Sequence, residues 1–129
     1  MSTEIVNKIQ TIIQLYSKKR TENFNNDVDL TRSYLITKLM EEFGEYCEVA
    51  GMKSFLTDRK AVKYNLIAGD GKVDTKRKHE YIHNKLYEEA GDLVWMALSI
   101  AFLEGHSIET LTDYIDSRKD AANKKLEEE

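Results

Sequence analysis

The 129-residue sequence contains no proline, and cysteine occurs once, at position 47. Proline interrupts helices and is common in the turns of β-rich domains, so its absence favours long helices. A lone cysteine excludes an internal disulfide and predicts a reducing, cytoplasmic location, with Cys47 as an inert core thiol on an apolar helix face. The longest apolar stretch, Leu93 to Leu103, is too short to span a bilayer, so no membrane association is expected.

The sequence also lacks a strong excess of charge of either sign, with 19 basic and 23 acidic residues and a formal net charge of −4. A protein that coats a nucleic acid polymer needs a basic surface, because counterion release provides much of its affinity. We therefore expect no nucleic acid polymer as a partner. A small anionic ligand in a local basic pocket remains compatible with this composition.

Hydrophobic residues recur at helical spacing in four segments, roughly 3–20, 29–52, 77–104 and from 107 to near the end of the sequence. Gly51 and Gly105 are expected to end the second and third of these helices, and Ser107 to cap the fourth. This pattern predicts an all-α fold, an antiparallel bundle of about four main helices in one domain over residues 1–129. The third helix is apolar on all sides after Asp92, which predicts a homodimer or homotetramer that completes the core.

Residues 53–78 differ from the rest, with eight basic side chains against three acidic ones. The turn signal at residues 69–71 and the scattered apolar residues predict a connecting insertion with one short helix. Two interpretations of this segment stay open. It is either a solvated loop, or a functional element, namely a mobile lid or a patch that attracts phosphate.

Two pairs of acidic residues stand at i, i+3 spacing, Glu42 with Glu45 and Glu89 with Asp92. On a helix such a pair shares one face and can hold one cation. Both pairs border the apolar stripes of their helices, where a bare carboxylate is unfavourable. It would stay protonated, pair with a base or bind a metal. We expect no matching basic residue on the same faces, and this favours Mg²⁺, with Mn²⁺ as a second possibility.

These pairs and their surroundings, KLMEEFGE and YEEAGDLVW, resemble the signature of the all-α nucleotide pyrophosphohydrolases. That superfamily includes MazG-like proteins, dimeric dUTPases and phosphoribosyl-ATP pyrophosphatase. The resemblance covers roughly residues 30–104 and implies a MazG-like fold and cleavage of a nucleoside triphosphate to monophosphate and pyrophosphate. It implies that Glu42, Glu45, Glu89 and Asp92 hold the catalytic metal. The 43 residues between the two pairs are more than short MazG-like proteins have, so the base and sugar of the substrate stay open.

Three further residues are candidates for substrate binding, namely Lys38, Lys119 and Asn123. Lys38 precedes Glu42 by one turn, where it can touch a phosphate or form an i, i+4 ion pair. Lys119 and Asn123 resemble polar positions of the family's C-terminal helix. The alternative to an enzyme is a helical interaction or regulatory protein that keeps this fold. A di-iron site is disfavoured, because Glu80-x-x-His83 has no second copy.

Overall fold

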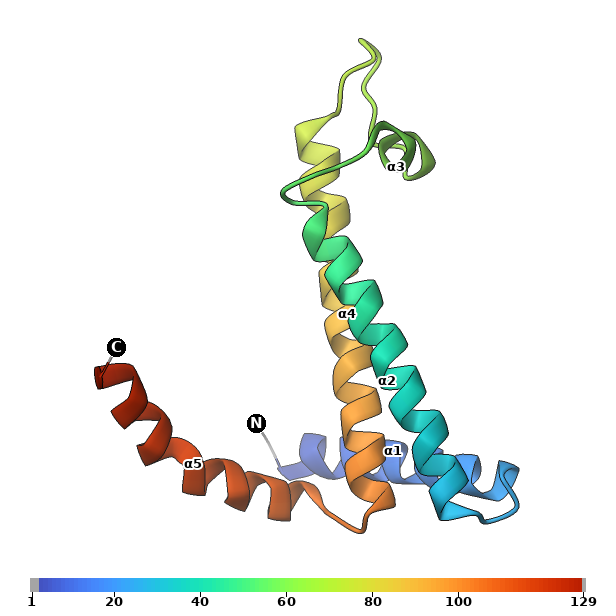
Figure 1. The fold of residues 1–129 in the computed structure, drawn as a ribbon, viewed down its shortest axis with the longest axis vertical. Coiled ribbons are helices and arrows are strands. Elements are labelled where there is room, and N and C mark those ends of the chain that lie inside the picture. The colour runs from blue at the N-terminus through green and yellow to red at the C-terminus, as the bar shows by residue number, and fades with distance from the viewer. Residues whose placement is uncertain (1–2, 129) are drawn as a thin grey trace. The chain divides into compact units, whose positions relative to one another are not determined.

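The computed structural model describes residues 3–128 and is all-α, with 80% of these residues in helices. Figure 1 shows five helices, α1 (Thr3–Asn23), α2 (Val28–Gly51), the short α3 (Asp58–Lys63), α4 (Thr75–Leu103) and α5 (Ile108–Glu128). Within the described part of the chain the only β-type pairing is an isolated antiparallel bridge between Ile67 and Val73. No helix of this part is long and apolar enough to cross a bilayer.

The four main helices match the four predicted segments, and their ends follow the predicted caps. Gly51 is the last residue of α2. After α4, Gly105 has a φ of +86°, and its N–H and that of His106 donate to Phe102 O and Ala101 O. This is a Schellman motif, which satisfies the last carbonyls of a helix. Ser107 Oγ then accepts from Thr110 N at 3.1 Å, so Ser107 caps α5 as predicted.

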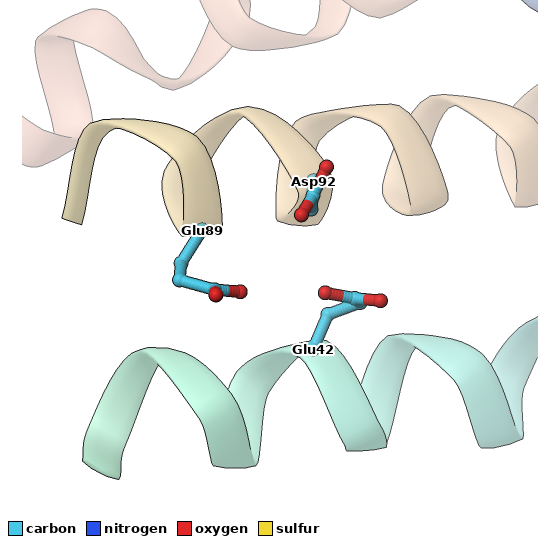
Figure 2. A group of neighbouring side chains, drawn as sticks. All are labelled: Glu42, Glu89 and Asp92. Atoms are coloured by element: carbon cyan, nitrogen blue, oxygen red, sulfur yellow. The ribbon is translucent and has the colours of Figure 1, made fainter. Parts of the chain in front are cut away.

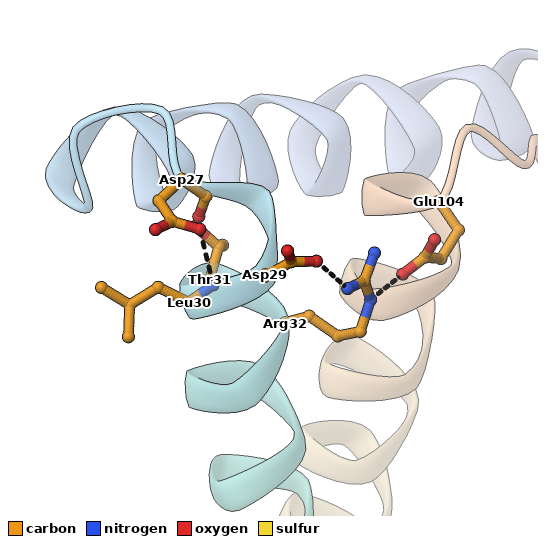
Figure 3. A network of polar contacts seen from close by, with 6 residues as sticks. All are labelled: Asp27, Asp29, Leu30, Thr31, Arg32 and Glu104. Atoms are coloured by element: carbon orange, nitrogen blue, oxygen red, sulfur yellow. Dashed lines mark hydrogen bonds and ion pairs between the residues drawn. The ribbon is translucent and has the colours of Figure 1, made fainter.

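Contacts between residues divide the chain into two compact units, Met1–Leu35 with Leu98–Glu129, and Ile36–Ala97. In the first unit, α1 packs on the end of α4, where the buried Ser17 hydroxyl donates to Ser99 O at 2.8 Å. Arg32 of α2 bonds both Asp29, at 2.7 Å, and Glu104, the residue that follows α4 (Figure 3). The Arg32 guanidinium lowers the pKa of the Glu104 carboxyl. This ion pair therefore joins the beginning of α2 to the end of α4.

In the second unit, the later part of α2 and the earlier part of α4 run antiparallel, side by side (Figure 1). Their core is built by one cluster of buried residues, which consists of Val49, Met52, Ala61, Leu66 and Ile82. Ala61 lies on α3 and Leu66 follows it, so the basic segment 53–78 contributes to the core. The short helix predicted there is confirmed, but the interpretation as a solvated loop is wrong for these residues.

One face of α2 remains uncovered in the single chain. Ile36, Met40 and Phe43 are 42%, 70% and 59% exposed, and Cys47 on the same stripe is also exposed. The prediction that Cys47 is a core thiol is therefore wrong within this chain. Helix α2 has a second apolar face, with Leu35 and Val49, and this second face is the one that packs against the rest of the chain. On α4, Trp95 is half-buried and Phe102 is buried.

Candidate metal centre

Three of the four predicted metal ligands converge between α2 and α4. Glu42 projects from α2 toward Glu89 and Asp92, which lie one turn apart on α4 (Figure 2). One carboxylate oxygen of each residue lies within 4.8 Å of those of the other two. The i, i+3 spacing on α4 places its two acids on one face, and the antiparallel packing of α2 brings Glu42 opposite them. Three oxygen ligands at this spacing are within reach of a single divalent ion.

Glu45, the fourth predicted ligand, lies beside this group and not within it. Its side chain is exposed, and it is not among the three residues whose oxygen atoms converge. Its charge and its hydrogen bonding nevertheless raise the pKa values of both Glu42 and Glu89. Glu45 and Glu89 also line the same hollow between α2 and α4, so Glu45 borders the converging group.

Burial and the mutual repulsion of the carboxylates together set the electrostatics of the cluster. Burial, followed by the negative charges of Glu45, Asp92 and Glu89, raises the pKa of Glu42. Burial and the charge of Glu45 are also the main causes that raise the pKa of Glu89. Like charges held together disfavour the ionised form, and a cation placed among them reverses this effect.

Two oxygen atoms of the cluster have no hydrogen-bond partner although they are buried. They are Glu42 Oε2 and Glu89 Oε2, one from each helix. A buried carboxylate oxygen without a donor is unfavourable, since folding removes its water without replacing it. A metal ion or a proton shared between the carboxylates would remove this cost.

A basic residue does lie next to the cluster, contrary to the expectation from the sequence. Lys85 is one turn before Glu89 on α4, pairs with Glu88 at 3.3 Å, and lowers the pKa of Glu89. The i, i+4 spacing of Lys85 and Glu89 was the signal that could have identified it. Its ammonium group offsets part of the negative charge of the cluster.

A hollow of about 190 Å³ lies beside the acid cluster, within the second unit. Glu45 and Glu89 form one side of it, and Tyr64 and Tyr81 form another. The two tyrosine rings stack with their centroids 4.8 Å apart and an interplanar angle of 22°. Tyr64 comes from the segment between α2 and α4, and no sequence motif pointed to it. This hollow gives a ligand a recess that is continuous with two of the candidate metal ligands.

The other predicted site residues lie apart from the converging carboxylates. Lys38 pairs with Glu41 at 3.1 Å, an i, i+3 contact on α2, and its role in substrate binding stays a prediction. Lys119 and Asn123 are exposed on α5, in the first unit, and their role in substrate binding stays a prediction. Glu80 and His83 are exposed on α4.

Comparison of the chain with protein-family models, with curated proteins and with solved structures gives no match. The resemblance to the nucleotide pyrophosphohydrolases therefore rests on the two acidic motifs and their surroundings alone.

Proposed function

We propose that this chain is a Mg²⁺-dependent nucleoside triphosphate pyrophosphohydrolase, which cleaves between the α and β phosphates. The observation that carries the proposal is the convergence of Glu42, Glu89 and Asp92 within 4.8 Å, from two antiparallel helices. The proposal is also supported by the buried oxygen atoms of Glu42 and Glu89 that have no hydrogen-bond partner. Hard carboxylate ligands of this kind suit Mg²⁺ or Mn²⁺, and Mg²⁺ commonly joins carboxylates to substrate phosphates.

Glu42, Glu89 and Asp92 would hold the ion, with Glu45 as an additional ligand. When bound, Mg²⁺ neutralises phosphate charge and makes a coordinated water more acidic. Attack of a water oxygen on the α-phosphorus breaks the bond to the bridging oxygen, and pyrophosphate leaves. The chain lacks a Gly-x-x-x-x-Gly-Lys-Ser/Thr loop, on which many enzymes that cleave at the γ-phosphate depend. Attack at the α-phosphorus is consistent with a carboxylate cluster fixed on helices.

The test is a screen of nucleoside triphosphates with Mg²⁺, in which the products are separated by ion-exchange chromatography. We expect monophosphate and pyrophosphate, and more than a hundredfold loss of turnover for Glu42→Gln and Glu89→Gln. Glu41→Gln and Glu88→Gln are matched controls, since these neighbours pair with lysines on the same helices. Absence of turnover with every nucleotide would favour the interaction protein instead. Turnover that survives in both cluster variants would reject the metal ligands.

The functional form is proposed to be a homo-oligomer that covers the exposed face of α2. Ile36, Met40, Phe43 and Cys47 are spaced by four, three and four residues, the spacing of a coiled-coil seam. Tyr87 and Val94 add exposed apolar surface on α4, at 81% and 57% exposure. A seam of this kind matches itself in a second copy, whereas a contiguous apolar stripe is unusual on the surface of a monomer.

Phe43→Asp tests this assembly, because it places a charge in the middle of the seam. We expect light scattering to show an oligomer for the unmodified chain and a smaller species for Phe43→Asp. Cys47 should then react faster with a thiol reagent in the variant. Phe55→Asp is the matched control, since Phe55 is 74% exposed but lies after α2. A monomeric unmodified chain would contradict the proposal.

A further inference from the structure

A second cavity in the Ile36–Ala97 unit has the opposite character to the acid cluster. It measures about 360 Å³ and its rim is basic, formed by Lys53, Lys78, His79 and His83, with Thr75 beside them. Its floor is apolar, formed by Ile82 and Leu86, and Ile82 is only 3% exposed. No carboxylate lines this cavity. Of the basic side chains of segment 53–78, Lys53 and Lys78 are the two that line it.

The two lysines of this cavity differ from three other lysines of the unit, which form ion pairs. Lys38, Lys60 and Lys85 each pair with a glutamate within 3.3 Å. Within residues 3–128, by contrast, neither Lys53 nor Lys78 has a carboxylate within 4.0 Å, the ordinary limit for an ion pair. The two imidazoles lie parallel, with their centroids 6.4 Å apart. Four basic groups around one hollow without a counter-charge form a receptor for a multiply charged anion.

The amide groups at the beginning of α4 do not provide this receptor. Asp74 Oδ1 accepts hydrogen bonds from Lys76 N and Arg77 N, so the carboxylate already caps the helix. The attraction for an anion comes from the side chains instead. The apolar floor of the cavity excludes water from one side of a bound anion. This strengthens the interaction of a phosphate with the lysines and histidines.

The apolar floor of the cavity lies on the same stripe of α4 as Glu89, whereas His83 is turned about 120° around the helix from Glu89. Leu86 of its floor is one turn before Glu89, about 4.5 Å along the helix axis, and His83 is about 9 Å away. This distance corresponds to the length of a short polyphosphate chain. A triphosphate whose α-phosphate lies at the carboxylates can therefore reach the cavity with its other end.

We infer that this cavity binds the pyrophosphate end of the substrate, that is, its β and γ phosphates, through Lys53, Lys78, His79 and His83. The assignment to a substrate rests on the proposed function, whereas the anion site itself does not. Lys53 follows α2 and the other three lie on α4, so the site forms only when the two helices pack. After cleavage the same groups would hold the leaving pyrophosphate until it dissociates.

The direct test is a titration with inorganic pyrophosphate in the presence of a chelator, followed by NMR of the histidine imidazoles. The sequence has three histidines, and His106, outside the cavity, serves as the internal control. We expect saturable shifts of His79 and His83 but not of His106. Lys53→Ala with Lys78→Ala should weaken pyrophosphate binding about tenfold. The matched control, Lys8→Ala with Lys19→Ala, removes the same charge from exposed positions of α1 and should bind normally.

Turnover distinguishes the two parts of the inference. If nucleotide hydrolysis is found, the Lys53/Lys78 double variant should raise KM about tenfold with kcat reduced much less. Saturable pyrophosphate binding with an unchanged KM would overturn the assignment to the substrate. Equal shifts of all three histidines, or equal binding by the two double variants, would overturn the site itself. If the proposed function is wrong, no nucleotide is hydrolysed. The metal-free titration with pyrophosphate still tests whether the cavity binds an anion.

Discussion

Replacement of Glu42 by glutamine should stabilise the metal-free protein, although it removes a proposed ligand. Glu42 faces the charges of Glu45, Glu89 and Asp92, and burial together with these charges raises the pKa of its carboxyl. A glutamine of the same shape removes one member of this repulsive group. Its amide can also donate a hydrogen bond to a remaining carboxylate.

The size of the effect follows from the separation of the charges. At 4.8 Å, the upper limit for the three converging oxygen atoms, two unit charges repel by about 1 kcal/mol in water. At an effective dielectric constant of 20 the same repulsion is about 3.5 kcal/mol. Because the cluster is partly exposed, we expect a net gain of about 1–2 kcal/mol, equivalent to a rise in Tm of about 3–8 °C.

Thermal unfolding followed by circular dichroism, in a chelator and in Mg²⁺, is the assay. With Mg²⁺ at ten times its Kd, the unmodified protein should gain about 1.4 kcal/mol, and Glu42→Gln should lose most of this gain. Glu41→Gln is the control and should change little in either buffer, because Glu41 forms only an exposed ion pair with Lys38. A Tm for Glu42→Gln below that of the control in chelator would refute the reasoning.

The same repulsion predicts how the stability of the metal-free protein depends on pH. The folded protein holds protons on Glu42 and Glu89 above the ordinary glutamate value of 4.5, because both pKa values are raised. The native state therefore binds more protons than the unfolded state in that range, and its stability falls as the pH rises through it. Glu42→Gln should flatten this part of the profile, which urea unfolding at several pH values will measure.

Three further predictions concern the stability of contacts within each of the two units. Ile82→Ala should lower the free energy of unfolding by about 3 kcal/mol in urea titrations, whereas Ile115→Ala, at a 67% exposed position, should change it by less than about 0.5 kcal/mol. Thr57→Ala should cost about 1 kcal/mol and speed amide exchange in α3, because Thr57 caps that helix; Thr57→Ser should restore it. Glu104→Gln should be less stable than the unmodified chain at neutral pH, and the difference should close as the pH falls below 4.5, since Arg32 lowers the pKa of Glu104.

Helix positions were predictable from the sequence because their determinants are local. Gly51, Gly105 and Ser107 act within one turn of their own positions, and each ends or caps a helix as predicted. The end of α1 was less well predicted, since the helix continues to Asn23, beyond Thr21, where a break was expected. There the reversal depends on the positive φ values of two asparagines that follow, which periodicity does not detect.

The faces of the helices were harder to assign than their ends. Helix α2 carries two apolar stripes, and periodicity alone does not tell which one packs within the chain; Cys47 was placed on the wrong side for this reason. The spacing of the four acids within α2 and within α4 was sufficient to place each pair on one face. The convergence of the two pairs, the hollow with Tyr64, and the cavity with Lys53 depend on contacts between distant segments, which no local pattern encodes.

The measurement that tests the central claim most directly is hydrolysis of a nucleoside triphosphate with Mg²⁺ in ¹⁸O-labelled water, followed by ³¹P NMR and mass spectrometry of the products. The proposal predicts monophosphate that carries the label, together with unlabelled pyrophosphate, and no product from Glu42→Gln. Label found only in pyrophosphate would place the attack at the β-phosphorus. Release of free phosphate, or no consumption of any nucleotide, would contradict the proposed reaction altogether.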